Sequence, residues 1–336
     1  MALSWNCASA TTTAVMLSPR SCDSPSAQLK YFGPAGAQSK VDLDARPSRS
    51  LDELFASVTD GKCEFAVVPL ENNMSGLLQD VLLKLIAAPN LHIFGEVLVA
   101  EEHCLCVQPG TKREDIRTVI SHAHLLLQSE KFLIGLEKEN GCHPIGRQCN
   151  FDSAGACALI DAPAKAAISS RRAGLSAGLE VVGSKLADLE SETRYIVLST
   201  KPATITNRLG LRCSVSFMLR NQEGALFKSL SCFAFRNLNI TKINTLPVAG
   251  KTELATADLA SGGAGAAIEL GRWDYGFVVD FAASTDARVN EAALSNLREF
   301  AANVRVLGTY TSAESAASGC ISRNASGLLG NLAGGF

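Results

Sequence analysis

A carboxylate and an amide at the end of an apolar run could bind a small polar ligand. Glu71 and Asn72 follow the run Glu64–Leu70. In α/β folds such side chains lie beyond the carboxyl ends of the strands, where ligands bind. Asn72 or Asn73 could equally cap the helix expected at Ser75–Ala88. A binding site and a simple helix cap are both consistent with this cluster.

A second polar cluster begins directly after the apolar run Ile116–Ile120. Ser121 opens it, and Gln128 lies seven residues later. Seven residues are about two turns of an α-helix, so these two side chains would share one helix face. His122 and His124 lie between them and are candidate acid–base groups, although lone histidines also serve purely structural roles.

Two more clusters offer hydroxyl and charged groups at the start of an element. Asp152 and Ser153 precede a run of small residues and could cap a helix or contact an anion. Thr193 and Arg194 enter an apolar strand that continues to about residue 200. The Arg194 guanidinium could bind a carboxylate through two parallel hydrogen bonds. A surface Thr and Arg at a strand end is the alternative.

The segment Lys30–Ser39 is expected to start as a strand and to run into a glycine-rich turn. Its two glycines would let the backbone approach an anionic ligand, and Ser39 could donate a hydrogen bond to a carboxylate or cap a following helix. A tight turn without a function explains the same residues.

The positions of these clusters suit an α/β fold with a second, smaller domain. Apolar runs alternate with helical stretches over residues 29–200. A linker is expected at 201–210, and residues 211–310 follow the order β-α-β-β-α-β of a ferredoxin-like domain. Val248–Trp273 is rich in Gly and Ala and is expected to be a mobile insertion. The tail 311–336 has low complexity and is expected to be disordered.

Composition excludes several classes of function. The chain has 336 residues, a net charge of −2 and no sustained basic run, so we expect no nucleic-acid partner. No segment reaches the roughly 18–20 consecutive apolar residues of a membrane span. The 11 cysteines form no CxxC pair and no metal-type cluster with histidine. We therefore expect no metal site and no membrane association.

The first 28 residues differ from the rest in composition. Ser, Thr and Ala dominate them, and Met1 to Cys22 contains no acidic residue. Organelle transit peptides are Ser-rich and poor in acids, and the shortage of Arg favours a plastid over a mitochondrial address. Residues 1–28 are therefore predicted to be a transit peptide, with an untargeted disordered leader as the alternative.

The order of the motifs, more than any single one, indicates a family. The chain resembles the prephenate and arogenate dehydratases over residues 29–310. The motifs that carry the resemblance are GPAGAQS at 33–39, VVPLEN at 67–72, ISH at 120–122, DSAGA at 152–156, ETRY at 192–195 and GALFKSLSCFAFRNLNITKI at 224–243. The segments at 275–281 and 305–310 resemble the plant-type arogenate enzymes in particular.

The resemblance implies a two-lobed catalytic domain, similar to periplasmic binding proteins, followed by a regulatory ACT domain. It implies decarboxylation of arogenate or prephenate coupled to loss of a ring hydroxyl, with no metal or organic cofactor. The implied catalytic residues are Thr193, Asn72, Ser121 and Gln128. The implied substrate-binding residues are Ser39, Glu71, Asp152, Ser153 and Arg194.

The resemblance also implies a phenylalanine effector, a homodimer or tetramer, and a location in the chloroplast stroma. Gly224, Ala225 and Leu226 match the family's effector-binding GAL motif. The partner motif ESRP is replaced by Asn244-Thr245-Leu246-Pro247, so feedback by phenylalanine is expected to be weak.

Two other functions fit parts of the sequence. The first is a non-catalytic amino-acid sensor that kept the dehydratase fold, favoured by a short predicted helix after Ser39. The second is a solute-binding module of the periplasmic type, which would leave the C-terminal domain unexplained.

Overall fold

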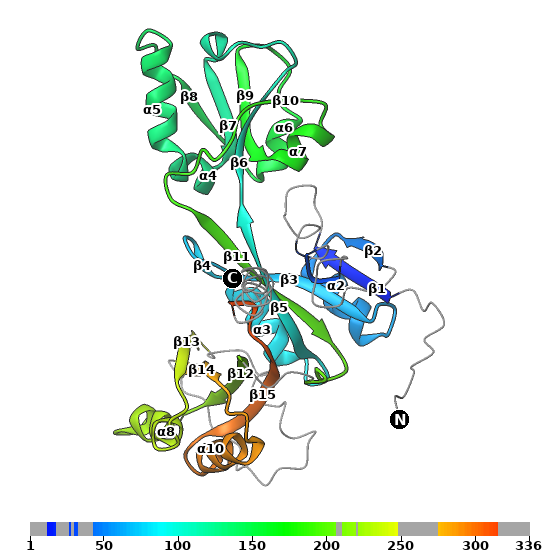
Figure 1. The fold of residues 1–336 in the computed structure, drawn as a ribbon, viewed down its shortest axis with the longest axis vertical. Helices are drawn as coiled ribbons and strands as arrows, with labels where there is room; N and C mark the ends of the chain where they lie inside the picture. Colours follow the sequence, from blue (N-terminus) through cyan, green and yellow to red (C-terminus); the bar gives the residue numbers. More distant parts are fainter. Residues whose placement is uncertain are drawn as a thin grey trace, which may run out of the picture.

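The computed structural model describes residues 12–17, 27, 30–32, 43–205, 210–219, 221–247 and 275–314. These residues form three β-sheets that follow one another along the long axis of the molecule (Figure 1). We refer to the parts built on them as the first lobe, the second lobe and the C-terminal domain. No helix among these residues is long and apolar enough to cross a membrane.

The first lobe is built on a mixed sheet with the strand order β2-β1-β3-β11-β5, with β4 paired to β3. Its strands are β1 (Thr12–Leu17), β2 (Leu43–Ser48), β3 (Phe65–Asn72), β4 (Gly76–Leu77), β5 (His92–Glu101) and β11 (Ser191–Ser199). Its helices are α2 (Leu51–Thr59) and α3 (Gln79–Ala87). Helix α2 begins with a capping box: Ser50 Oγ accepts from Glu53 N, and Glu53 Oε2 accepts from Arg49 N.

The second lobe is built on a sheet with the order β10-β6-β9-β7-β8. Its strands are β6 (His103–Val107), β7 (Thr118–His122), β8 (Gly146–Asn150), β9 (Lys165–Ser170) and β10 (Glu180–Gly183). Its helices are η1 (Arg113–Asp115), α4 (Ala123–Gln128), α5 (Glu130–Glu139), α6 (Ser153–Cys157) and α7 (Arg171–Ser176). The chain enters this lobe between β5 and β6, where Glu102 alone separates the strands, and returns between β10 and β11 (Figure 1). The expected two-lobed architecture is therefore present.

The C-terminal domain has the expected order β-α-β-β-α-β. Its elements are β12 (Leu211–Met218), α8 (Ala225–Ala234), β13 (Ile240–Pro247), β14 (Tyr275–Ala282), α10 (Ala287–Phe300) and β15 (Ala302–Thr311). They form an antiparallel sheet in the order β13-β14-β12-β15. Both helices cover one face of it, where Phe233, Phe281 and Leu297 form a core.

The other face of this sheet packs on the first lobe. Leu307 and Tyr310 share a core cluster with Leu85 and Leu91 of the first lobe. Gly308 lets the backbones of β15 and β5 come together, because a Cβ there would lie 2.3 Å from the carbonyl oxygen of Ile93. Apolar contacts thus join the C-terminal domain to the first lobe.

The N-terminal part of the chain differs from the sequence prediction. Strand β1 lies between β2 and β3, and Ala14 and Val15 are buried in the first lobe. A leader that ended at residue 28 would remove this strand, so the predicted boundary is wrong. Tyr31 and Phe32 are helical and buried beside Phe65, so residues 30–32 do not start a strand. Ser39, with the glycine-rich turn, lies outside the described residues.

Smaller differences concern the ends of elements. The helix expected from Ser121 to about residue 135 is interrupted at Ser129, which separates α4 from α5. The predicted disordered tail begins too early, because β15 extends to Thr311 and Ala313 N donates to Glu96 Oε1. The remainder of the tail and the predicted insertion lie outside the described residues.

Candidate active site

A cavity of about 400 Å³ lies between the two lobes, next to the segments that connect them. The first lobe contributes residues from β3, β5 and β11, and the second lobe contributes residues from β6, β7 and α4. Its polar lining consists of Asn72, Ser75, Glu101, Glu102, His103, His122, His124, Gln128, Ser153, Ser170, Thr193 and Tyr195.

The Thr193 hydroxyl is held by two hydrogen bonds, one that it accepts and one that it donates. Thr193 lies on β11 directly opposite Asn72 of β3 and Val99 of β5, and its side chain is buried. Asn72 Nδ2 donates to Thr193 Oγ1 at 2.9 Å. Thr193 Oγ1 in turn donates to Glu101 Oε1. The pairing register of three neighbouring strands thus fixes the position of this hydroxyl.

Asn72 is itself fully engaged. Its Nδ2 also donates to Ser191 Oγ at 2.9 Å, and its Oδ1 accepts from the backbone N of Met74 and Ser75 at 2.8 and 2.9 Å. The helix-cap interpretation of this residue is wrong, because α3 begins only at Gln79 and the Asn72 oxygen instead caps a turn, while its nitrogen holds Thr193. Such a network allows one rotamer and so places Thr193 accurately.

Glu101 is a functional candidate that the sequence analysis missed. Its Oε2 accepts from Ser191 Oγ at 3.0 Å and lies 3.7 Å from His103 Nε2. Burial raises the pKa of Glu101, but the interactions with His103, Thr193 and Ser191 outweigh burial and keep that pKa below its ordinary value. Glu101 is therefore a carboxylate at neutral pH. The sequence feature that could have identified Glu101 is the acidic pair Glu101-Glu102 between two apolar runs.

The second lobe contributes Gln128, as predicted, together with Ser153 and the two histidines. Gln128 Oε1 is buried and has no hydrogen-bond partner among the described residues. A buried polar atom beside a cavity is a natural contact for a ligand. His122 and His124 stack with their ring centroids 5.4 Å apart.

Two predicted site residues of the second lobe point elsewhere. Ser121 is completely buried and donates to the carbonyl oxygen of Ile168, and it does not line the cavity. Because it belongs to strand β7, it does not share a helix face with Gln128. Asp152 caps α6 by accepting from Gly155 N, so the capping interpretation applies to it.

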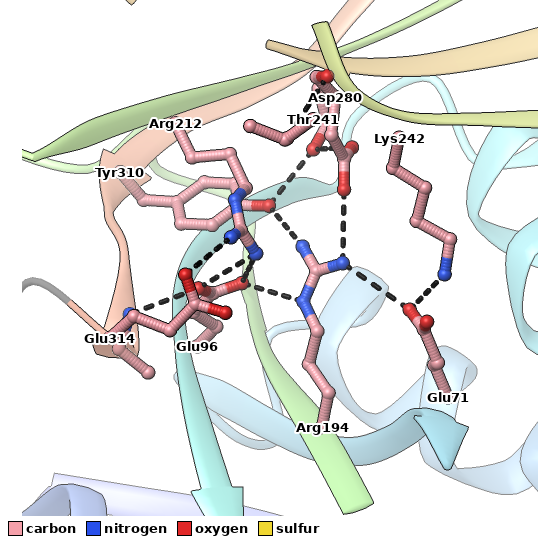
Figure 2. Close-up of polar contacts among 11 residues, drawn as sticks. Glu71, Glu96, Arg194, Arg212, Thr241, Lys242, Asp280, Tyr310 and Glu314 are labelled. Atoms are coloured by element: carbon pink, nitrogen blue, oxygen red, sulfur yellow. Dashed lines mark hydrogen bonds and ion pairs between the residues drawn. The ribbon is translucent and has the colours of Figure 1, made fainter. Parts of the chain in front are cut away.

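Arg194 and Glu71 point away from the cavity and toward the C-terminal domain (Figure 2). Arg194 Nη1 donates to Asp280 Oδ2 at 2.9 Å, and Nη2 donates to Tyr310 Oη at 2.8 Å. Arg194 Nε donates to Glu96 Oε2 at 2.6 Å. Burial lowers the pKa of Arg194, but these acidic neighbours outweigh it and raise that pKa above its ordinary value.

Glu71 completes this polar network at the domain interface. Its carboxylate lies 3.5 Å from Arg194 Nη1 and forms an ion pair with Lys242 of β13 (Figure 2). The predicted role of both residues in substrate binding is therefore wrong for this structure, in which they join two domains.

The predicted effector residues lie on two elements of the C-terminal domain. Gly224 adopts a left-handed conformation (φ 69°) at the start of α8, which Ala225 and Leu226 continue. Asn244 lies on β13, an edge strand, opposite Val278.

No group of three or more His, Cys, Asp or Glu side chains within the described ranges is arranged to hold a metal ion.

Comparison with known proteins identifies relatives over most of the chain. Residues 22–203 match the family model of prephenate dehydratase. The chain is 36% identical over 299 residues to arogenate dehydratase/prephenate dehydratase 2, chloroplastic, of Arabidopsis thaliana, covering 84% of this chain and 72% of that protein.

Two solved structures share the fold. Prephenate dehydratase from Arthrobacter aurescens in complex with L-Phe matches with a TM-score of 0.72 and 24% identity, over 90% of this chain and 91% of that one. A protein described as a quorum quenching acylase, GqqA, matches with a TM-score of 0.70 and 24% identity, over 89% and 97%. Because one fold carries both descriptions, function must be argued from the site.

Proposed function

The chain belongs to the prephenate dehydratase family, and we propose that it is a carbon–oxygen lyase acting on arogenate, prephenate or both. The products would be phenylalanine and phenylpyruvate, respectively. The observation that carries this proposal is the position of Thr193 in the cavity, between the amide of Asn72 and the carboxylate of Glu101.

The reaction removes a carboxylate and a hydroxyl group from a cyclohexadiene ring. The electrons of the breaking C–C bond enter the ring, carbon dioxide leaves, and the hydroxyl departs as water after taking up a proton. Because the product ring is aromatic, the reaction is strongly favourable, and the protein mainly has to help the hydroxyl leave. Negative charge develops on that oxygen, and Thr193 would stabilise it in the transition state by turning its single hydroxyl proton from Glu101 to the leaving oxygen.

A threonine hydroxyl is a weak acid, so its position matters more than its acidity. Asn72 and Glu101 fix Thr193 Oγ1 in place before any substrate binds, which reduces the entropy cost of reaching the transition state. Gln128 and Ser153 reach the cavity from the second lobe and would orient the substrate as neutral polar groups. A substrate held by both lobes would be shielded from water.

We propose that the C-terminal domain is of the regulatory ACT type, with phenylalanine as a weak effector. Its βαββαβ order supports this assignment, as does the L-Phe bound to the Arthrobacter aurescens relative. We also propose a homodimer or tetramer, and a location in the chloroplast stroma, since the Arabidopsis relative is named chloroplastic. Any removable leader would have to end before Thr12, because β1 belongs to the first lobe.

The test is a turnover assay with the purified protein. Arogenate and prephenate would each be supplied, and phenylalanine and phenylpyruvate would be measured by chromatography. Formation of either product, lost in Thr193→Ala, supports the proposal. Binding of an amino acid without turnover of either substrate would favour the non-catalytic sensor instead.

A further inference from the structure

The described lining of the cavity holds three histidines but no side chain with a fixed positive charge, although the site would receive dicarboxylates. Two carboxylates, Glu101 and Glu102, line it, and none of its described lining residues is a Lys or Arg. A ligand with two carboxylate groups would therefore meet negative charge. Unless part of the ligand is cationic, this arrangement opposes binding.

The two carboxylates differ in how their charge is balanced. Glu102 faces the guanidinium of Arg171, with Oε2 3.4 Å from its Nε. Glu101 forms no ion pair with a Lys or Arg in the described part of the chain, and its nearest basic group is the His103 imidazole at 3.7 Å. Its hydrogen bonds come from the neutral hydroxyls of Thr193 and Ser191. These stabilise the negative charge but do not cancel it.

The two candidate substrates differ at one functional group. Arogenate carries an ammonium group on its side chain where prephenate carries a ketone, and the ring with its hydroxyl and carboxylate is the same. An ammonium donates three hydrogen bonds and carries a positive charge, whereas a ketone only accepts. A carboxylate with unused lone pairs therefore discriminates between the two substrates. It attracts the ammonium group of arogenate and repels the carbonyl oxygen of prephenate.

We infer that Glu101 binds the ammonium group of the substrate and so makes the cavity selective for arogenate over prephenate. This inference rests on the proposed function and refines it. It assigns to Glu101 a second role beside that of holding Thr193. The carboxylate suits both roles, since Thr193 and Ser191 together occupy only two of its about four lone-pair positions.

The test compares kcat/KM for the two substrates in the unmutated protein and in Glu101→Gln. Removing the charge also loosens Thr193, which lowers turnover of both substrates by a common factor. The ratio of the two kcat/KM values cancels that factor and isolates recognition of the ammonium. We expect the arogenate-to-prephenate ratio to fall at least tenfold in Glu101→Gln and to be largely kept in Glu101→Asp.

Glu102→Gln is the matched control, because it removes a cavity carboxylate that Arg171 already balances. Its ratio should stay close to that of the unmutated protein. An unchanged ratio in Glu101→Gln, or an unmutated protein that prefers prephenate, overturns the inference while leaving the proposed function intact. Failure of the unmutated protein to convert either substrate overturns the proposed function instead. Thermal unfolding of each variant identifies any that does not fold. Calorimetric titration of phenylalanine and of phenylpyruvate into the unmutated protein and into Glu101→Gln then gives the same comparison without turnover, because any binding of phenylalanine to the C-terminal domain is common to both proteins.

Discussion

Thr193 and Arg194 are consecutive residues of β11 that serve opposite faces of one sheet. The Thr193 hydroxyl lines the cavity, and the Arg194 guanidinium contacts Asp280 of the C-terminal domain. Their partners on β3 alternate in the same way, since Asn72 lies opposite Thr193 and Glu71 lies opposite Arg194. Side chains of a strand alternate between faces, so the proposed catalytic groups and the domain interface share two strands. A shift of β3 or β11 would therefore affect both the proposed catalytic groups and the domain interface.

Thr193→Ala tests the proposed catalytic residue. We expect kcat to fall by about 100-fold or more, as when a preorganised donor to a developing negative charge is removed. Thr193→Ser should recover part of the activity, because it keeps the hydroxyl. The thermal midpoint of either variant should drop by only a few degrees, since about 1 kcal/mol of hydrogen bonding is lost. A loss of activity of only a few-fold in Thr193→Ala would contradict the assignment.

Arg194→Met tests the domain interface. Arg194 is buried among Glu96, Asp280 and Tyr310, so its removal leaves Asp280 buried without its guanidinium partner, whereas Glu96 keeps its ion pair with Arg212. Breaking a buried ion pair from one side costs about 3–5 kcal/mol. We expect chemical denaturation to show this loss, with the C-terminal domain becoming more sensitive to limited proteolysis.

Two further variants separate charge from geometry at this position. Arg194→Lys keeps the charge but lacks the planar fork, so it should recover only part of the stability. The double variant Arg194→Met with Asp280→Leu should be less destabilised than the two single effects combined, because it removes both charges of one pair. Additive effects would show that Arg194 and Asp280 do not interact in solution.

Ser121 and Gln128 provide a direct comparison between the sequence prediction and the structure. Gln128 lines the cavity and Ser121 does not, although both were predicted to be catalytic residues. We expect Gln128→Ala to raise KM by about tenfold, the effect of one lost hydrogen bond to a charged ligand. Ser121→Ala should leave KM nearly unchanged and should lower stability slightly. A large rise in KM for Ser121→Ala would restore its predicted role.

The sequence predicted the elements better than the directions of their side chains. The alternating pattern at 211–219 predicted a strand, which β12 confirms. Arg194 was expected to bind a carboxylate in the site, but it lies one residue along the strand from Thr193, and that step reverses the face. Ser121 was assigned to a helix that begins only at Ala123, so its predicted direction was also wrong.

Long-range pairing explains the remaining differences. The composition of Thr12–Leu17 resembles a leader, and only its pairing with β2 and β3 reveals a strand of the first lobe. Glu101 becomes a site residue because β5 lies beside β11 in the sheet. Ser191 and Thr193 then meet a carboxylate that is about ninety residues away along the chain. Local patterns carry no information about such contacts.

Phenylalanine is predicted to inhibit this enzyme weakly or not at all. In the family's motif an acid and a base occupy the positions that are Asn244 and Leu246 here. Each charge-assisted hydrogen bond that is lost costs about 1.5–3 kcal/mol, and about 1.4 kcal/mol is tenfold in affinity. One such loss is enough to move an effector site out of its working range. Basal activity should persist, because Asn244 lies on β13 and not in the cavity.

Calorimetric titration of phenylalanine, beside an inhibition curve, measures this effect. Asn244→Glu restores the acidic group of the motif on the same strand and should strengthen both binding and inhibition. Ile243→Glu, at an exposed position of β13 next to Asn244, is the matched control for added negative charge and should change neither. Tight binding with strong inhibition in the unmutated protein would show that the Asn-Thr-Leu-Pro segment supports an effector site without charged partners. The contacts to phenylalanine would then come from the backbone near Gly224 at the start of α8, because a helix leaves its first amide groups without partners inside the helix.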